Sequence, residues 1–502
     1  MKHSILIFSL FCWMTTLTAQ PEVDRNRDKV WIFGSDNSTN IPGVDGSIVD
    51  FSSDPPITSY VNKPIEQYTT DASICDKQGN LILYTNGLMI SNRNHQILAN
   101  SEDFYSGPYV EGLGLPMCQG ALFLPMPESD SLYILIHPLM KFAEPLGGVP
   151  IRLQYSMIDM SRNGGDGEAI LLNHLIINDT LDWGHLTACR HANGRDWWIL
   201  IPELVSNRFY RLLLDPEGLH LNGEQRIGDV LGTLLTVSQA VFSPNGTQYV
   251  RSRGALYYLP DTMAVYDFDR CTGLLSNPVT ITHTTDSLLV GSTLAISPNS
   301  RFLYKTLGLY MWQYDLQAPD IATSRLLVHT ATQQGFFAMQ LAPDGKIYAS
   351  TSGYSPYLHR IDYPDLPGPA CGVCEICVPL PSYNWYSMPN FPNFRLGPVD
   401  GSVCDSLGIN VGLEEVEVSS SGEQVELWPN PFNETLHIET LGNKAGLFRL
   451  YDQLGRVVLE SKTSQSNDEV GTAHLPPGLY FWEFWLPGMA KPASGKCIKI
   501  GD

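Results

Sequence analysis

Four cysteines in the second half of the chain have the spacing closest to that of a chemical site. Cys371, Cys374 and Cys377 form a C-x2-C-x2-C run, and Cys404 follows farther on. Three thiolates with a distant fourth can bind zinc or an iron–sulfur cluster. A four-thiolate metal site usually has two clean pairs of cysteines, which this run lacks. Disulfides, in contrast, persist in exported proteins, and both ends of this sequence indicate export. We therefore expect disulfides among these four residues, with the pairing left open, and no metal or other cofactor.

The other cysteines are predicted to be buried. The sequence has 10 cysteines, and removal of a leader containing Cys12 leaves an odd number, so at least one thiol is free or joined to another molecule. Cys75, Cys118, Cys189 and Cys271 lie in or beside strand-like runs. There a cysteine serves as a small apolar side chain.

Two histidines could do acid–base or metal chemistry. His185 and His191 flank a short segment before a tryptophan-rich strand, but no paired carboxylates accompany them, so we interpret both as ordinary hydrogen-bonding residues. The glycine-rich stretch 164–167 lacks the lysine and the following helix of a phosphate-binding loop.

The acidic run Asp24-x-Asn26-x-Asp28 begins like a calcium loop. Lys29 and Ser35 stand where that loop needs a glycine and a bidentate acid, so we interpret the run as a solvated N-terminal linker. The chain also has no G-x-S-x-G, no H-E-x-x-H and no complete sialidase-type Asp box. We therefore assign no catalytic residue, and we favour a protein that is not an enzyme while leaving that question open.

Six tight polar turns, each followed by an aromatic-rich strand, indicate how the body is built. They are Asp76–Asn80, Pro127–Asp130, Ala192–Asp196, Ser243–Thr247, Ser297–Arg301 and Ala342–Lys346. Repeats at intervals of about 45 to 65 residues are typical of propellers, whose blades have four strands. In these turns proline fixes φ, and Asn or Asp with Gly accepts the left-handed conformation.

These turns predict an all-β fold, a β-propeller of seven blades with six as the alternative. The seventh blade would contain the strand at Trp31–Gly34. We expect Trp31–Phe33 to close the ring by pairing with the segment around Asn393–Arg395. Composition agrees, because turn-formers and aromatics abound while only 17% of residues are charged. The net charge of −21 excludes nucleic acid as a partner and disfavours anionic membrane surfaces.

Three motifs follow one another near the C-terminus. They are Trp428-Pro429-Asn430-Pro431, then Leu450-Tyr451-Asp452 with Gly455-Arg456, then Leu475-Pro476-Pro477-Gly478-Leu479-Tyr480. Short apolar runs broken by Asn-Pro, Leu-Gly and Pro-Gly turns predict a small antiparallel β-sandwich.

Order and spacing of these motifs resemble the type A C-terminal sorting domain of type IX secretion cargo from Bacteroidetes-like bacteria. The resemblance implies a partner, the type IX secretion machinery, and a location that is secreted or attached to the outer-membrane surface. It also implies that these residues form the sorting signal: Pro429, Asn430, Pro431, Tyr451, Asp452, Gly455, Arg456, Pro477, Gly478 and Tyr480.

The N-terminus predicts a secretory signal peptide. Lys2 and His3 precede an apolar run from Ile5 to about Leu17, with cleavage expected near Ala19 or Gln20. That run is shorter than the ~20 residues needed to cross a bilayer. No later run is long enough, so we expect Sec export to the periplasm and no transmembrane segment in the mature chain.

The body is similar to the secreted WD40-like or YVTN-type propellers of Bacteroidetes that carry a type IX tail. The residues that carry this likeness include Trp31-x-Phe33-Gly34, the stretch 76–87, Ser297-Pro298-Asn299-Ser300, Gln313-Tyr314-Asp315 and Pro389-Asn390-Phe391. The likeness implies fold and export but no catalytic residue.

The sequence thus predicts a signal peptide at 1–20, a propeller at 28–404, an acidic Ser-rich linker at 405–426 and a sorting domain at 427–502. We expect an exported binding or scaffold module for a surface protein or glycan. The alternatives are a polysaccharide hydrolase or lyase with its site at the channel mouth, and a structural component of a surface assembly.

Overall fold

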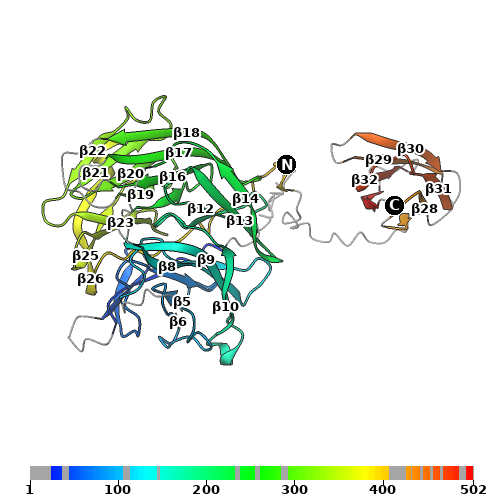
Figure 1. Ribbon diagram of the computed structural model, residues 1–502. Coiled ribbons are helices and arrows are strands. Elements are labelled where there is room, and N and C mark those ends of the chain that lie inside the picture. The colour runs from blue at the N-terminus through cyan, green and yellow to red at the C-terminus, as the bar shows by residue number, and fades with distance from the viewer. Residues whose placement is uncertain are drawn as a thin grey trace, which may run out of the picture. The chain divides into compact units, whose positions relative to one another are not determined.

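The protein is built almost entirely of β-strands, as the computed structural model shows (Figure 1). The structure describes residues 24–36, 45–105, 113–143, 147–231, 238–254, 260–283, 292–405, 425–430, 432–440, 445–452, 456–463, 467–485 and 493–500. The chain divides into two compact units, Met1–Gly412 and Leu413–Asp502, here called the body and the C-terminal unit. In the described ranges no helix is long and apolar enough to cross a membrane.

Small antiparallel sheets make up the body, and each is formed by strands that are consecutive in the chain. The first two are β1 (Val30–Gly34), β2 (Gly46–Asp50), β3 (Ile57–Val61), and β4 (Ala72–Cys75), β5 (Leu81–Thr85), β6 (Ile90–Asn92). The third is β7 (Leu122–Pro125), β8 (Leu132–Ala143), β9 (Gly147–Asp159), β10 (Glu168–Ile177), with the short 3-10 helix η2 (Asn163–Gly165) before β10.

The remaining four sheets of the body have four strands each. The fourth sheet is β11 (Thr187–Arg190), β12 (Trp197–Pro202), β13 (Arg208–Asp215), β14 (Gly218–Arg226), and the fifth is β15 (Ala240–Phe242), β16 (Gln248–Arg253), β17 (Asp261–Asp269), β18 (Leu274–His283). The sixth is β19 (Thr293–Ile296), β20 (Phe302–Leu307), β21 (Tyr310–Asp315), β22 (Leu326–Thr330). The seventh is β23 (Phe336–Leu341), β24 (Ile347–Thr351), β25 (Ser355–Ile361), β26 (Val373–Asn384), with the 3-10 helix η3 (Gly368–Cys371) before β26. These small antiparallel sheets confirm the all-β class and are consistent with a propeller.

All six turns predicted from the sequence join the first strand of a sheet to its second. Each has one residue with positive φ: Gly79, Glu128, Gly194, Gly246, Ser300 and Gly345. Side chains fix the same turns from within, since Asn245 Oδ1 accepts from Thr247 N at 3.1 Å and Asn299 Oδ1 accepts from Arg301 N at 3.0 Å. Local residue chemistry therefore sets these six corners.

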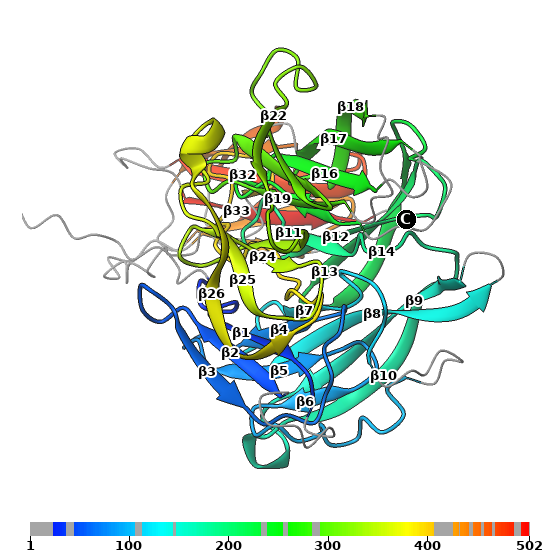
Figure 2. The same ribbon diagram turned by 90° about the vertical axis from the view of Figure 1, so that its left-hand side faces the viewer.

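Successive sheets contact one another in cyclic order. The contacts run from β1 to β4, β4 to β7, β10 to β14, β11 to β15, β15 to β19 and β19 to β23. The order closes because β26, the last strand of the body, contacts β1, β2 and β3 (Figure 2). Ser382 joins this closing contact by accepting a hydrogen bond from Asp45 N at 2.8 Å.

The expected closing ladder between Trp31–Phe33 and Asn393–Arg395 is wrong. Strand β1 pairs with β2, and residues 385–395 form no strand. Pro389 and Pro392 lack the N–H groups that a ladder needs, which accounts for the difference. Side-chain contacts and single backbone hydrogen bonds, such as Asn390 N to the Asp71 carbonyl at 2.9 Å, close the ring instead.

These closing contacts connect the beginning of the body with residues 388–395. The ring of Trp31 lies 6.0 Å from that of Phe391, and Arg395 donates two 2.7 Å hydrogen bonds to Asp28. Asn390 donates its side-chain N–H groups to the carbonyls of Ala121 and Leu186 at 2.9 and 3.0 Å. One segment at the end of the body thus ties three other parts of the ring together.

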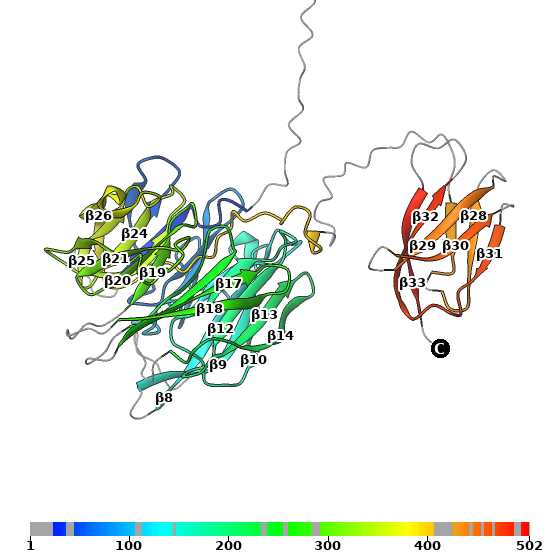
Figure 3. The same ribbon diagram turned by 90° about the horizontal axis from the view of Figure 1, so that it is seen from above.

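The C-terminal unit contains two sheets (Figure 3). Their strands are β27 (Val425–Trp428), β28 (Thr435–Thr440), β31 (Asn467–Gly471), and β30 (Val457–Thr463), β29 (Gly446–Tyr451), β32 (Gly478–Trp485), β33 (Ala493–Lys499). Both sheets contribute to one buried apolar cluster that includes Ile438, Phe448, Val470 and Phe484. This unit therefore has a core of its own.

Candidate functional site

One concave site is a cavity of about 490 Å³ lined by the first strands of four consecutive sheets, β11, β15, β19 and β23. We call it the axial cavity. Its walls are largely apolar and include Val241, Phe242, Ile296 and Leu341. Residues 391–393, 395 and 396 form a further part of the lining. The volume lies within the range of pockets that hold small ligands or side chains.

The repeated turns supply the rim of the axial cavity. Pro244, Pro298 and Pro343 come from three successive turns with the pattern Ser/Ala-Pro-Asn/Asp, and all three line the cavity. The same proline that starts each turn therefore places a rigid apolar ring at the cavity. This gives the cavity an apolar edge with little conformational freedom to lose on binding.

One ion pair stands in this apolar lining. Asp28 accepts both hydrogen bonds of the Arg395 guanidinium and is itself buried. Burial raises the pKa of Asp28, and the neighbouring Arg395 only partly offsets that effect. Asp28 is the single carboxylate among the described lining residues, so the paired carboxylates expected for polysaccharide hydrolysis are not found at this cavity.

The amide of Gln119 is fully used by the fold. Its Nε2 donates to the carbonyl of Ala240 at 2.8 Å, and its Oε1 accepts from the N–H of Ala240 at 2.8 Å. Gln239 makes the same kind of link farther round, accepting from Leu294 N and Met339 N at 3.3 and 3.2 Å. These glutamines tie inner strands to one another and leave the apolar walls as the surface offered to a ligand.

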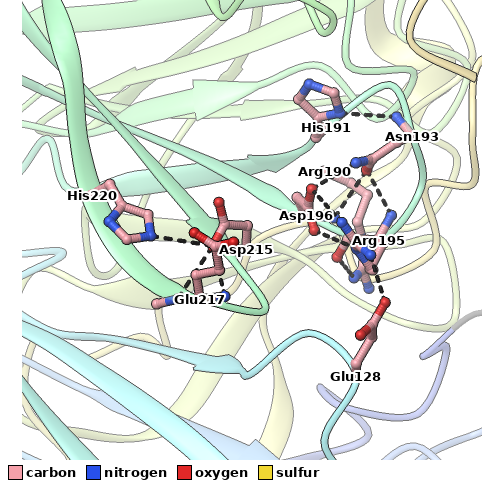
Figure 4. Close-up of polar contacts among 10 residues, drawn as sticks. Glu128, Arg190, His191, Asn193, Arg195, Asp196, Asp215, Glu217 and His220 are labelled. Carbon is pink, nitrogen blue, oxygen red and sulfur yellow. Dashed lines mark hydrogen bonds and ion pairs between the residues drawn. The ribbon is translucent and has the colours of Figure 1, made fainter. Parts of the chain in front are cut away.

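A second, charged cavity of about 340 Å³ lies among the neighbouring turns. Arg195 reaches from one turn to Glu128 on the next at 2.5 Å (Figure 4). Asp24 binds Arg27 at 3.0 Å and Arg190 at 3.2 Å. Each of these charged side chains thus forms an ion pair with another. The ion pairs around this cavity connect the neighbouring turns.

The predicted solvated linker at Asp24–Asp28 is therefore wrong. Asn26 donates to the Lys77 carbonyl at 2.9 Å, Asp24 pairs with two arginines, and Asp28 binds Arg395. The acidic side chains that resembled a calcium loop instead fasten the start of the body to its turns. Within the described ranges, no group of three or more His, Cys, Asp and Glu side chains is arranged to hold a metal ion.

Both candidate histidines make local hydrogen bonds. His191 Nδ1 accepts from Asn193 N at 3.0 Å, and its Nε2 faces the Cys271 carbonyl at 3.1 Å (Figure 4). Burial lowers the pKa of His191. His185 is fully buried between the carboxylate of Asp182 and the backbone of β16. Both are therefore inaccessible to substrate.

Four cysteines are paired in the structure. Cys374 is joined to Cys377, with 5.9 Å between Cα atoms, and Cys271 to Cys404, with 5.6 Å. Cys371 is a buried thiol whose pKa is raised by burial. Cys271 thus lies in a disulfide instead of serving as the small apolar side chain expected from the sequence. We propose the same pairing for the protein in solution.

Buried thiols account for the other cysteines expected to be apolar side chains. Cys75, Cys118 and Cys189 are all buried, and burial raises the pKa of each thiol to about 12. These thiols therefore have little thiolate character.

The sorting-signal residues occupy turns and core positions of the C-terminal unit. Asp452 and Arg456 close a turn through a 2.7 Å ion pair, and Tyr451 donates to Glu483 at 2.9 Å. Gly478 begins β32, and buried Tyr480 donates to the Pro476 carbonyl at 2.6 Å.

Other residues of the sorting signal are exposed or fall outside the described residues. Pro429 and Asn430 follow β27 and are exposed. Pro431 and Gly455 fall outside the described residues, as do the leader 1–20 and residues 406–424 of the linker. Of the described residues, Tyr451 and Asp452 lie at the end of β29 that pairs with Phe481 of β32, beside Tyr480, and Asp452 holds Arg456 there.

Sequence reasoning missed a cluster of partly exposed aromatic rings. It joins Tyr354, Tyr383 and Trp385 with rings from two other segments. The run Tyr383-Asn384-Trp385-Tyr386 was the available signal. Its other members are distant in sequence, so the cluster exists only once the ring has closed.

Comparisons with known proteins bear mainly on the C-terminal unit. No curated protein matches the chain. Among solved structures, the chain is similar to PorZ of Porphyromonas gingivalis, described as an essential surface component of the type IX secretion system. Identity is 9%, the TM-score is 0.37, and the match covers 91% of this chain but only 63% of that one.

A second similar structure is the periplasmic gluconolactonase of Pseudomonas aeruginosa. Identity is 14%, the TM-score is 0.35, and the match covers 78% of this chain and 97% of that one. We draw nothing about fold or activity from likenesses this remote. Residues 426–485, in contrast, match the family model of the secretion system C-terminal sorting domain, so the chain carries that sorting domain, as its three terminal motifs predict.

Proposed function

We propose that this protein is an exported binding module of the cell surface. Its body is a seven-bladed propeller, and its C-terminal unit is a β-sandwich that the type IX secretion machinery recognises. The mature protein is released or remains attached at the outer-membrane surface. The sorting-domain match at 426–485 supports the export part of this proposal.

Cyclic contacts support the propeller. Each sheet of the body touches the next, and the last touches the first through β26. The shared core cluster of the two C-terminal sheets supports the sandwich. A closed ring leaves its inner strands around a common axis, which is where propellers bind ligands without moving their blades.

The axial cavity is the observation that carries the binding role. Four blades converge on it, its rim is stiffened by three prolines, and its walls are largely apolar and contain the Asp28–Arg395 pair. Such a site fits an apolar side chain from a segment of a surface protein, with Arg395 beside it to meet a polar backbone or carboxylate. We infer no chemistry at this cavity, because a lone, ion-paired carboxylate provides no acid–base pair.

Filling the axial cavity tests this role. Ala295 lines it, and Ala318 is a partly exposed alanine that does not. We expect outer-surface protein fractions of the native host to raise the melting temperature of the full chain and of Ala318→Leu, but not of Ala295→Leu. The same wells are assayed for release of sugar. Equal stabilisation of both variants would place binding elsewhere, and sugar release would favour the hydrolase alternative.

A further inference from the structure

Six aromatic rings form a connected cluster at one end of the body, and we call it the seam cluster. Neighbouring ring centroids lie 4.4 to 5.3 Å apart in the order Tyr383, Tyr354, Trp385, Tyr68, Tyr386, Phe337. Tyr383 and Tyr354 are stacked with 11° between their planes. A backbone hydrogen bond also joins two of its segments, since Tyr386 N donates to the Tyr68 carbonyl at 3.1 Å.

The seam cluster lies away from the axial cavity. Tyr354 is in the connection from β24 to β25, and Trp385 follows the end of β26. The turn that lines the axial cavity joins β23 to β24. Because successive connections of an antiparallel sheet alternate between its two ends, the seam cluster and that turn are at opposite ends of the same sheet. The two sites can therefore be tested separately.

Exposure distinguishes the seam cluster from the aromatic core. Trp31, Phe33 and Tyr348 pack in the interior with no exposed surface. None of the six seam rings is buried, and Tyr383 is 37% exposed. Aromatic side chains that served only to close the body would be stabilised by full burial, as the aromatic side chains of the core are. A contiguous, partly exposed aromatic surface is instead typical of a binding site.

One buried carboxylate, that of Glu66, lies beside the seam cluster. Glu66 accepts from the backbone N–H of Asp36 at 3.0 Å and interacts electrostatically with Tyr68 and Tyr354. The neighbouring cation, Lys63, is buried and donates to the carbonyls of Gly34 and Ile65. Its charge is thus turned inward. With a net charge of −21 on the chain, this surface disfavours uronic, sulfated or phosphorylated polymers.

We propose that the seam cluster binds an uncharged polysaccharide. Pyranose rings present flat C–H faces that pack on aromatic rings, and their hydroxyl groups can exchange hydrogen bonds with the hydroxyls of Tyr68, Tyr354 and Tyr383. Because the seam cluster has six rings and is not a single pocket, it offers contacts to several consecutive sugars of a chain. This inference adds a ligand class to the proposed binding module and does not depend on the axial cavity.

Affinity electrophoresis of the full chain tests the proposal. Native gels would contain galactomannan, xylan or hydroxyethylcellulose as neutral probes, and alginate as the anionic probe. We expect at least one neutral polymer, but not alginate, to retard the wild-type protein. Because no charge takes part, the same binding measured by calorimetry should change less than twofold between 50 and 500 mM NaCl.

Matched tyrosine and tryptophan variants locate the site. Trp385→Ala and Tyr354→Ala should each weaken binding at least tenfold. Tyr363→Ala is the control, because Tyr363 is 62% exposed and follows β25, at the other end of the sheet. Tyr383→Ala covers the case in which Trp385→Ala fails to fold. Ala295→Leu, which fills the axial cavity, should bind the polymer normally.

Several outcomes would overturn the assignment. They are a wild type retarded by none of the neutral polymers, retardation by alginate that salt removes, and equal binding by Tyr383→Ala, Trp385→Ala and Tyr363→Ala. Loss of surface-protein binding in Trp385→Ala, with no polysaccharide bound by the wild type, would assign the seam cluster to a protein partner instead.

Discussion

Replacing Arg395 by glutamine should weaken the ring closure by a measurable amount. The guanidinium holds Asp28 with two 2.7 Å hydrogen bonds, and the Asp28 side chain is only 3% exposed. Removing one partner of a buried pair costs about 3–5 kcal/mol when the remaining charge stays buried. Because the Arg395 side chain is 34% exposed, water can partly replace it, and we expect about 2.5 kcal/mol at pH 7.

That loss converts to a small but clear thermal shift. With an unfolding entropy of about 2.1 cal/mol/K per residue over a body of roughly 380 residues, 2.5 kcal/mol lowers the melting temperature by about 3 °C. The assay is thermal unfolding of the full chain followed by near-ultraviolet circular dichroism. Tyr363→Ala, on an exposed surface remote from the pair, provides the baseline.

The pH dependence gives this prediction a second readout. Burial already raises the folded-state pKa of Asp28, and loss of Arg395 raises it further. A carboxyl with a raised folded pKa binds its proton more tightly when folded, so Arg395→Gln should regain stability relative to wild type as the pH falls from 7 toward 4.

A double variant completes the test. Asp28→Asn removes the stranded charge, so Asp28→Asn with Arg395→Gln should be more stable at pH 7 than Arg395→Gln alone. A melting temperature for Arg395→Gln within 1 °C of wild type, or no rescue in the double variant, would refute the role assigned to this pair.

Three further predictions follow from other parts of the chain. Burial raises the pKa of Glu375, but hydrogen bonds that include those from the N–H groups of Thr332 and Gln333 together outweigh burial and lower the pKa to about 2. Its contribution to stability should therefore be lost as the pH falls from about 4.5 to 2; melting temperatures over that range should fall less steeply in Glu375→Gln, and parallel curves would contradict this. Peptide mapping without reduction should find Cys374 joined to Cys377 and Cys271 to Cys404, with Cys371 alkylated only after unfolding; a bond to Cys371 would reject the pairing. Deleting residues 427–502 in the native host should leave the body in the periplasm, as fractionation and surface labelling would report, and normal surface display would reject the sorting role.

The parts of the fold that are predictable from sequence are those fixed by neighbouring residues. Asn299 and Gly246 set the φ angles and hydrogen bonds of their own turns, so these residue types alone place the corners and the strands that follow them. The C-terminal unit is predictable for the same reason. Some of its motif residues have local partners, as Asp452 does in Arg456 and Tyr480 does in the Pro476 carbonyl.

Ring closure and the seam cluster depend on partners that are distant in sequence. Asp28 meets Arg395, and Tyr68 meets Trp385, only after every sheet between them has formed. No local pattern encodes such a meeting. The acidic run at the start of the body therefore resembled a solvated linker, and the closing segment resembled a strand, although its two prolines remove the donors that a strand needs.

The closing segment also determines when the body can be completed. Residues 388–395 are the partners of Trp31 and Asp28 and of the carbonyls of Ala121 and Leu186. A chain that emerges N-terminus first supplies this segment last, so the early strands must wait with their partners missing. Contacts of such long range form slowly. The contacts that close the ring therefore cannot form until residues 388–395 are present, whereas each sheet is built from consecutive strands and does not need them.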